Sequence, residues 1–547
     1  MIKYLIFLSF FVAHSSYAAS SVSPKQSVVA SAHPQATQAG IDILNDGGNA
    51  FDAAAAVALT IGVAEPVGSG IGGGGFFLLY IAKEDRYIMI DARETSPKLA
   101  GIGEVYQTQS SINGPQSAGV PGLIAGVDHL IQNYGRLDRK KDAKHAIKLA
   151  QNGFEVSEHF QRVASWRKDV LSNNTARNIY LKQGKVPALG TKIKQLALAE
   201  TLTRFAKYGV NDFYRGGTAG RLVADMKRDG GLIREEDLNQ YKVIERKPVR
   251  FSYQGFEWIS ASLPSSGGIV LAETLGILKN DNLQSLPKVD SSHLLIEAMK
   301  LAYRDRNQHL GDADFISIPD LLNPKRLQKL RQNIDENKAT PSSKLAASDP
   351  SGNGVDTTHF SIIDKQGNMV AATLSINYGF GSGYVSPSTG ILLNDEMDDF
   401  ATQPGQPNAY GLVQGESNAV APNKRMLSSM SPTFIQGQDK TFIVGTPGGS
   451  RIISMVLLAG LGFTHGDDDI NHWINAPRFH HQFLPDIIQH EQGAFNPELQ
   501  QALQAKGHKF KQIRNYGNMH AIVWDRTTGQ TQGASDNRGE GLTSTLP

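Results

Sequence analysis

The sequence predicts an α+β fold in which helices and strands occur in blocks. Residues 119–345 have mainly helical patterns, whereas strand patterns predominate from Thr357 onward. Two helical segments interrupt the strands of that second part. This block order favours layers of sheet and helix over a regular parallel βαβ fold. Because 547 residues exceed the usual single core, we expect one large domain of two lobes or two tightly packed domains.

The first predicted elements are two helices and a strand joined by a glycine-rich loop. Apolar residues at helical spacing predict a helix over 35–44, and Asn49 can cap an alanine-rich helix over 51–63. The loop 68–75 contains a G-x-G-x-x-G, but it follows a helix and precedes a strand at 76–82, the reverse of a dinucleotide site. We therefore expect this loop to pack closely against neighbouring backbone and not to bind phosphate.

The other predicted elements follow from hydrophobic periodicity. Helices are expected over residues 120–134, 196–208, 292–305, 324–333, 450–461 and 496–506. Strands are expected over residues 87–90, 249–253, 256–260, 360–364, 369–375, 441–444 and 520–524. The sequence contains no internal repeat and no heptad pattern.

Composition excludes several classes of function. The apolar content of 40%, with 55 glycines and 24 prolines, is typical of a globular, loop-rich protein. A formal net charge of +2 predicts no polyanionic partner, so we expect no binding of nucleic acid. The chain has no cysteine, which excludes a cysteine nucleophile and thiolate metal sites.

The N-terminus has the pattern of a signal peptide. Lys3 precedes an apolar run at 4–12, and the small residues of 16–19 offer a cleavage site. The alternative is a short buried helix. No later segment has the ~20 apolar residues that a membrane span requires. We expect residues 1–19 to be removed and the protein to be exported, either to a periplasm or to the outside.

Thr357 is the candidate nucleophile. A polar segment at 341–355 leads to it, and a strand pattern begins there. Cleavage of the backbone between Asp356 and Thr357 would give Thr357 a free amine beside its own hydroxyl, so that one residue would carry both base and nucleophile. No G-x-S-x-G occurs, which disfavours a serine hydrolase.

Other segments offer the groups that an acyl-transfer site requires. Gly448 and Gly449 precede an apolar helix, where backbone N–H groups can stabilise an oxyanion, although an ordinary loop remains possible. Arg93 follows a strand and fits either a carboxylate clamp or a surface ion pair. Glu396 and Asp399 belong to an acidic cluster that could bind a metal, an amine or only solvent. Without neighbouring His or Cys, an amine is favoured over a transition metal.

These motifs, in this order, resemble those of the γ-glutamyltranspeptidases, which are N-terminal nucleophile hydrolases. The resemblance covers residues 30–536. It implies a stacked αββα sandwich formed by two subunits cut from one precursor, a large subunit of 20–356 and a small subunit of 357–547. The motifs that carry it are Asp91-Ala92-Arg93-Glu94, Leu263-Pro264-Ser265-Ser266-Gly267-Gly268, Thr357-Thr358-His359-Phe360-Ser361, Met397-Asp398-Asp399-Phe400, Leu427-Ser428-Ser429-Met430-Ser431-Pro432 and Pro447-Gly448-Gly449-Ser450-Arg451.

The resemblance also implies a role for each site residue. Thr357 would be the nucleophile, and Ser375 would supply a hydroxyl that contacts it. The amides of Gly448 and Gly449 would form the oxyanion hole. The α-carboxylate of a γ-glutamyl group would be held by Arg93, Ser428 and Ser429, and its α-amine by Asn377, Glu396 and Asp399. The segment 404–424, which contains Tyr410, resembles a lid over the donor pocket.

The activity that the resemblance implies is transfer of a γ-glutamyl group from glutathione or a related donor. The acceptor would be water or the amine of an amino acid or peptide, and neither a metal nor another cofactor is expected. Tyr378 departs from the commonest family pattern and could alter the acceptor side. Two alternatives remain: an amidase for poly-γ-glutamate or β-lactam side chains on the same scaffold, and a non-catalytic exported scaffold protein.

Overall fold

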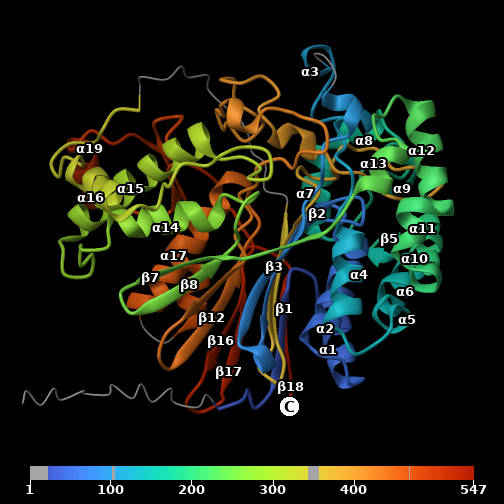
Figure 1. The fold of residues 1–547 in the computed structure, drawn as a ribbon, viewed down its shortest axis with the longest axis horizontal. Coiled ribbons are helices and arrows are strands. Elements are labelled where there is room, and N and C mark those ends of the chain that lie inside the picture. Colours follow the sequence, from blue (N-terminus) through green and yellow to red (C-terminus); the bar gives the residue numbers. More distant parts are fainter. Residues whose placement is uncertain (1–21, 102–104, 343–356, 467–468) are drawn as a thin grey trace, which may run out of the picture.

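A computed structural model describes residues 22–101, 105–342, 357–466 and 469–547. Two antiparallel sheets stack at the centre of the molecule, and helices cover both outer faces (Figure 1). The α+β prediction and the αββα sandwich that the resemblance implied are both confirmed. The predicted signal peptide (1–19) and Asp356 lie outside the described residues. In the part of the chain that is described, no helix is both long and apolar enough to cross a membrane.

The first sheet combines strands from both sides of Thr357. Its order is β18-β1-β9-β10-β2-β3-β6, and all neighbours are antiparallel. Three of its strands follow Thr357 in the chain, and one strand from before Thr357, β1, lies between two of them. The bounds are β1 (Ser27–Ser31), β2 (Gly74–Ile81), β3 (Arg86–Ala92), β6 (Ile244–Arg246), β9 (Thr358–Ile363), β10 (Met369–Ser375) and β18 (Leu542–Leu546).

The second sheet is also shared between the two parts of the chain. Its order is β17-β16-β12-β11-β8-β7, and it is antiparallel throughout. The bounds are β7 (Val249–Tyr253), β8 (Phe256–Ser260), β11 (Thr433–Gln436), β12 (Lys440–Gly445), β16 (His520–Asp525) and β17 (Thr531–Ser535). Small additional sheets contain β4 (Phe154–Glu155), β5 (Lys192–Ile193), β13 (Phe479–His480), β14 (Ile488–His490) and β15 (Phe510–Gln512).

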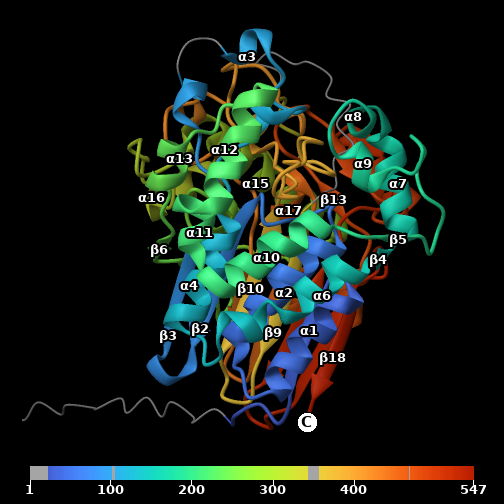
Figure 2. The same cartoon turned by 90° about the vertical axis from the view of Figure 1, so that its right-hand side faces the viewer.

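One helical layer covers the first sheet, in front of β9 and β10 in Figure 2. It contains α1 (Pro34–Asn45), α2 (Ala50–Ala64), α4 (Leu123–Asn133), α6 (Lys144–Asn152), α10 (Leu196–Tyr208), α11 (Val210–Arg215) and α12 (Gly217–Asp229). The opposite layer contains α14 (Gly267–Ile277), α15 (Lys288–His309), α16 (Pro324–Gln332), α17 (Ile452–His465), α18 (Ile470–Asn475) and α19 (Pro497–Ala505). Shorter helices are α3 (Val105–Thr108), α5 (Arg139–Asp142), α7 (Glu158–Trp166), α8 (Lys168–Ser172), α9 (Arg177–Tyr180) and α13 (Glu235–Gln240).

Strand β2 shows how the sheets bury both faces. Phe76 and Leu78 belong to the core that includes the second sheet, whereas Phe77 and Leu79 belong to the core under α2 and α4. Successive side chains of a strand point to opposite faces, so the continuous apolar run of β2 fits a sheet that is covered on both sides.

The glycine-rich loop before β2 packs against backbone, as predicted. A Cβ atom on Gly72 would lie 2.0 Å from the Leu392 carbonyl oxygen, and one on Gly73 would lie 2.1 Å from the Ser375 carbonyl oxygen. Only glycine allows so close an approach. The loop therefore brings the chain before β2 directly against the end of β10.

Most predicted elements are confirmed, but several helix boundaries were wrong. The helix predicted over 292–305 is α15 (Lys288–His309), and the helix predicted over 450–461 is α17 (Ile452–His465). The helix predicted over 120–134 begins at Leu123, because Val120 pairs with Thr95 in an extended conformation. The second predicted helix is confirmed with its cap, since the Asn49 side chain accepts from the backbone N–H of Phe51 and Asp52.

Candidate active site

Thr357 lies immediately before β9, beside the last residue of β10. Thr358 pairs with Leu374, so the register places Ser375 next to Thr357. The Thr357 Oγ1 and Ser375 Oγ atoms are 3.4 Å apart, and both side chains are buried. Ser375 Oγ also accepts a 2.8 Å hydrogen bond from the Asn377 backbone N–H. The turn after β10 thus orients the hydroxyl that faces the candidate nucleophile.

A pocket is present at Thr357. Eight of the sequence-predicted site residues line it, namely Arg93, Thr357, Ser375, Asn377, Asp399, Ser428, Ser429 and Gly449. Tyr410 and Arg306 line it as well. Of the remaining predicted residues, Gly448 precedes Gly449 in the loop, and Glu396 lies behind the pocket wall against Arg93. Residues from eight separate segments of the chain, Thr357 included, therefore line one pocket.

Arg93 is fully buried and is held by carboxylates. Its Nη1 lies 2.6 Å from Glu396 Oε2, and its Nη2 lies 2.5 Å from Asp399 Oδ2. The Glu94 carboxylate is 3.5 Å from the same Nη1. Burial raises the pKa of Glu396 to about 7, against the opposing effect of the Arg93 charge. The two groups that the resemblance assigned to opposite ends of the substrate are in direct contact.

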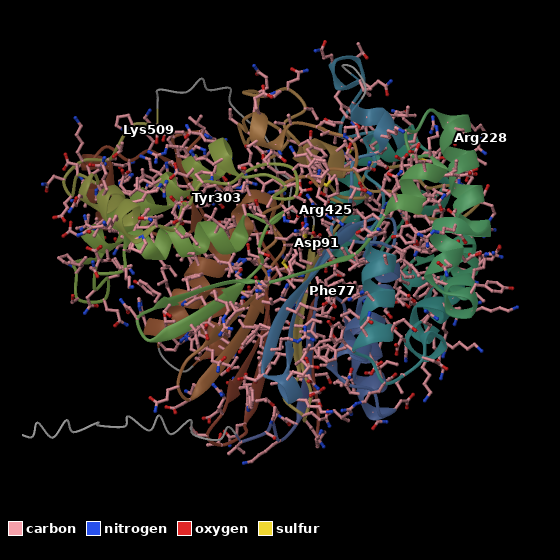
Figure 3. All side chains as sticks on the ribbon, viewed as in Figure 1. Phe77, Asp91, Arg228, Tyr303, Arg425 and Lys509 are labelled. Atoms are coloured by element: carbon pink, nitrogen blue, oxygen red, sulfur yellow. The ribbon has the colours of Figure 1, made fainter. Side chains whose placement is uncertain are left out.

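Hydrogen bonds to the backbone position these charges. The Tyr241 hydroxyl donates to the Arg93 carbonyl oxygen at 2.9 Å. The Asn394 side-chain amide donates to the Gly72 carbonyl at 2.7 Å, and its Oδ1 accepts from the Glu396 N–H at 3.0 Å. Asp91, labelled near the centre of Figure 3, accepts from the Arg93 N–H at 3.0 Å. Asn394 thereby ties the turn that contains Glu396 to the glycine loop, whereas the Arg93 backbone is held by Asp91 and Tyr241.

Ser428 and Ser429 are positioned by the segment 263–268. The Ser428 N–H donates to the Pro264 carbonyl at 2.8 Å, and the Ser266 N–H donates to the Ser428 carbonyl at 2.8 Å. Two motifs of the resemblance that are far apart in the sequence thus form one paired unit. Their backbone hydrogen bonds leave the Ser428 and Ser429 side chains on the pocket wall.

Arg306 is a site residue that the sequence interpretation missed. It lies at the end of α15, where its Nη2 donates to Ser429 Oγ at 3.1 Å and its Nε donates to Ser266 Oγ at 3.0 Å. It is fully buried, and no carboxylate of the described residues lies within 4.0 Å of its guanidinium. Burial lowers the pKa of Arg306 to about 10. The available signal was its place on the apolar helix face, three residues after Tyr303.

The Gly448-Gly449 loop lies beside Thr357, since Gly449 lines the same pocket. Gly448 has φ of 144° and Gly449 has φ of 58°, a region that favours glycine. Among the described residues, neither amide N–H has a hydrogen-bond acceptor. The loop leads through a short 3-10 turn (Gly449–Arg451) into α17, whose N-terminal dipole favours negative charge at this point. The geometry suits stabilisation of an oxyanion.

Tyr410, which belongs to the segment 404–424, lines the pocket at Thr357. Its hydroxyl donates to the Asn377 carbonyl at 3.2 Å, and its ring centroid lies 5.0 Å from that of Tyr378. A Cβ atom on Gly449 would lie 2.4 Å from the Tyr410 ring. Tyr410 therefore contacts the two loops that flank Thr357.

Comparison with known proteins decides the family. The profile of the family described as Gamma-glutamyltranspeptidase matches residues 36–546. The chain belongs to the γ-glutamyltranspeptidase family. It is 40% identical to the glutathione hydrolase proenzyme of Escherichia coli, over 94% of this chain and 91% of that protein. It is 39% identical to the glutathione hydrolase proenzyme of Pseudomonas aeruginosa, with 91% of each covered.

Solved structures place the γ-glutamyltranspeptidase fold among the N-terminal nucleophile hydrolases. A cephalosporin acylase from Bacillus halodurans superimposes with a TM-score of 0.83 at 26% identity, covering 99% of both chains. A chain of the Helicobacter pylori γ-glutamyltranspeptidase superimposes with a TM-score of 0.54 at 34% identity, covering 57% of this chain and 93% of that one.

Replacing Arg306 with Lys is expected to lower kcat/KM for a γ-glutamyl anilide roughly tenfold or more, mainly through KM. Lysine keeps the charge but cannot donate to Ser266 and Ser429 at once, and hydrogen bonds to charged groups contribute about 1.5–3 kcal/mol each. Steady-state kinetics would measure the effect. The half-exposed neighbour Arg304, changed to Lys, is the matched control. Equal kinetics for the two variants would contradict the assignment of Arg306 to the site.

The inhibition constant of L-glutamate is expected to depend on the ionisation of Glu396. In the folded protein this carboxyl is protonated below its pKa of about 7, so it attracts an ammonium group only above that pH. Glutamate should therefore bind more tightly as pH rises through about 7, and Glu396→Gln should remove this dependence. Competitive inhibition measured between about pH 5.5 and 8.5 tests it. A flat wild-type profile would show that Glu396 does not control binding.

Proposed function

We propose that this protein is a self-processing γ-glutamyltransferase and hydrolase. It takes the γ-glutamyl group of glutathione or a related compound onto Thr357 and passes it to water or to the amine of an amino acid or peptide. The observation that carries the proposal is the convergence of Thr357, Ser375, the Gly448-Gly449 loop and the Arg93 cluster on one pocket. Family membership and the names of the relatives, which are glutathione hydrolase proenzymes, support it.

Maturation would begin with the Thr357 hydroxyl. Its oxygen attacks the Asp356 carbonyl carbon, the bond from that carbon to the Thr357 nitrogen breaks, and the nitrogen takes the hydroxyl proton. Water then hydrolyses the ester, which leaves an Asp356 carboxylate and a free Thr357 amine. The products would be a large subunit of 20–356 and a small subunit of 357–547. Since both sheets contain strands from each side of Thr357, the two subunits would stay associated.

The free amine then serves as the base in catalysis. A terminal amine has a pKa of about 7.7–8.0, so a useful fraction is neutral near neutral pH. It accepts the hydroxyl proton as Thr357 Oγ1 attacks the γ-carbonyl carbon, and it later returns a proton to the leaving amine. The Gly448 and Gly449 N–H groups would stabilise the oxyanion. Ser375 Oγ, 3.4 Å from the nucleophile, orients its hydroxyl. Water or an acceptor amine completes the cycle by attacking the acyl-enzyme.

The charged pocket fits the free amino acid end of a γ-glutamyl group. In this proposal the substrate ammonium approaches Asp399, Glu396 and the Asn377 side chain, and the α-carboxylate approaches Arg93, Ser428 and Ser429. Asp399 is the bridge between both ends, because it already contacts Arg93 and is partly exposed to the pocket. A zwitterion brings one charge of each sign, so it can insert into the ion pair without leaving a net charge buried.

A second candidate is amide hydrolysis of β-lactam side chains. The superposition on a cephalosporin acylase over 99% of both chains supports this second activity. The Arg93–Asp399 ion pair at the pocket argues against β-lactam side chains as substrates. If the substrate carboxylate takes Arg93 from Asp399, an acyl group without an α-amine offers Asp399 no replacement cation. Parallel assays of a γ-glutamyl anilide and a glutaryl cephalosporin would separate the two activities.

We also propose that residues 1–19 direct export and are removed. The apolar run of 4–12 and the small residues of 16–19 support this proposal. The destination would be the periplasm or the outside of the cell. Sequencing the N-terminus of the protein recovered from each compartment would identify both the cleavage point and the destination.

Replacing Thr357 with Ala is expected to give a single uncut chain with no γ-glutamyl transfer, because the hydroxyl for both reactions is lost. Wild-type protein should give two fragments, the smaller beginning at Thr357. Denaturing electrophoresis and intact mass would measure this. Thr357→Ser keeps a hydroxyl and is the matched control, in which cleavage should persist. An uncut wild-type chain without activity would favour the non-catalytic scaffold.

Replacing Tyr410 with Phe or Ala tests the proposed lid. Phe removes only the hydrogen bond to the Asn377 carbonyl, and Ala also removes the ring that packs on Gly449. We expect Ala to raise the glutathione KM roughly three- to tenfold and to increase hydrolysis relative to transfer, since water enters an open pocket more freely. Phe should have a smaller effect in the same direction. Unchanged KM and product ratio in both variants would rule out a lid role.

A further inference from the structure

A cluster far from Thr357 has the composition of a metal site. His293 and Glu297 lie one turn apart on α15, and His508 comes from the segment between α19 and β15. Their nearest nitrogen and oxygen atoms all lie within 4.8 Å of one another, and all three residues are buried. The cluster sits where α15, α16 and α19 gather in Figure 1, and the label of Lys509 marks this region in Figure 3.

We propose that His293, Glu297 and His508 form a structural site for a divalent transition metal of the Zn²⁺ class. Two imidazoles and one carboxylate are ligands that zinc commonly takes in proteins, with water as a fourth ligand. The i, i+4 spacing places His293 and Glu297 on one helix face. The site is separate from the pocket at Thr357 and serves the assembly of the fold, not the acyl-transfer reaction.

The hydrogen bonds of His293 prepare it for this role. Its Nε2 lies 2.8 Å from the Asp335 carbonyl oxygen, which can only accept, so Nε2 carries the proton. Nδ1 therefore presents a lone pair toward His508 Nε2 at 2.8 Å. A backbone carbonyl that accepts from the far ring nitrogen is the usual support of a metal-binding histidine.

The metal would replace the proton between the two imidazoles. Two nitrogens bound to zinc at about 2.0–2.1 Å in tetrahedral geometry lie about 3.3 Å apart. The present separation of 2.8 Å must therefore open by roughly half an ångström, a shift that side-chain rotation can supply. His508 then carries its proton on Nδ1, and its Nε2 lone pair faces the metal.

The charges around the cluster allow a divalent cation. Glu297 and Asp486 supply two negative charges, and Lys300 supplies one positive charge. Lys300 Nζ lies 3.0 Å from Glu297 Oε1 and competes with the metal for that carboxylate. It can move toward Asp486, whose Oδ1 is 3.5 Å away. His481 also faces Asp486, at 3.4 Å. Lys300 thus sets the affinity of the site.

The three proposed ligands come from both sides of Thr357 in the chain. His293 and Glu297 precede Thr357 in the chain, and His508 follows it. A metal bound by all three would cross-link the two parts that cleavage separates. The chain has no cysteine and hence no disulfide, so a metal would be the one cross-link of this kind available to these residues.

The test uses purified processed protein, stripped with a chelator and titrated with Zn²⁺. We expect one Zn²⁺ per large–small pair and a higher thermal midpoint. His508→Gln should weaken binding tenfold or more. Lys300→Met should strengthen binding roughly tenfold, because it removes the competing ammonium. The exposed His472, changed to Gln, controls for surface binding.

Co²⁺ absorption keeps the proposal testable if His508→Gln fails to fold. Wild-type protein should show the intense visible bands of four-coordinate Co²⁺, and Lys300→Met should show them at lower Co²⁺ concentration. Absence of a bound equivalent in wild type, a six-coordinate spectrum, or equal Zn²⁺ affinity in wild type and Lys300→Met would each overturn the site. None of these readouts depends on γ-glutamyl transfer.

Discussion

The interleaving of strands from the two sides of Thr357 is the constraint on which the structure depends. β1 lies between β18 and β9, and β8 lies next to β11, so each sheet holds strands from before and after the proposed cut. Separating the two parts would break backbone ladders and both apolar cores at once. A chain without disulfides can therefore lose the peptide bond at Thr357 and keep its fold. The new terminus would begin a strand that its neighbours already hold in place.

The same sheets bring opposite charges together at the pocket. Arg93 extends from the end of β3, and Asp399 belongs to the turn that Asn394 ties to the glycine loop before β2. A buried arginine requires a counter-charge, and Glu396 and Asp399 provide it. Arg306 differs, because its contacts are hydroxyls and an amide oxygen and not a carboxylate. The pocket thus combines a neutralised arginine with one whose charge still favours an anion such as a substrate carboxylate.

The spacing of hydrophobic residues predicted those helices and strands in which that spacing is regular. β7, β8, β10 and α10 have the bounds that hydrophobic spacing indicated. The buried strand β1 escaped prediction because its partners β9 and β18 lie more than 300 residues away in the chain. The motifs located the groups that line the pocket, but no local signal indicated that Arg93 would pair with Glu396. Arg306 lies on the apolar face of α15, but its role could not be predicted because its contact with Ser429 spans 123 residues.

Tyr410, in the segment proposed as a lid, contacts two parts of the candidate active site. Tyr410 packs on Gly449 and hydrogen-bonds to the Asn377 carbonyl, so it touches the proposed oxyanion loop and the turn that orients Ser375. A side chain at Gly449 would displace that ring, and glycine is therefore needed both for its backbone angle and for closure. The Tyr378 ring contacts the Tyr410 ring in a tilted arrangement, and the Tyr378 hydroxyl donates to the Ala409 carbonyl. In the proposed mechanism this pair of rings contributes to the balance between water and acceptor amine, because Tyr378 holds the backbone next to Tyr410.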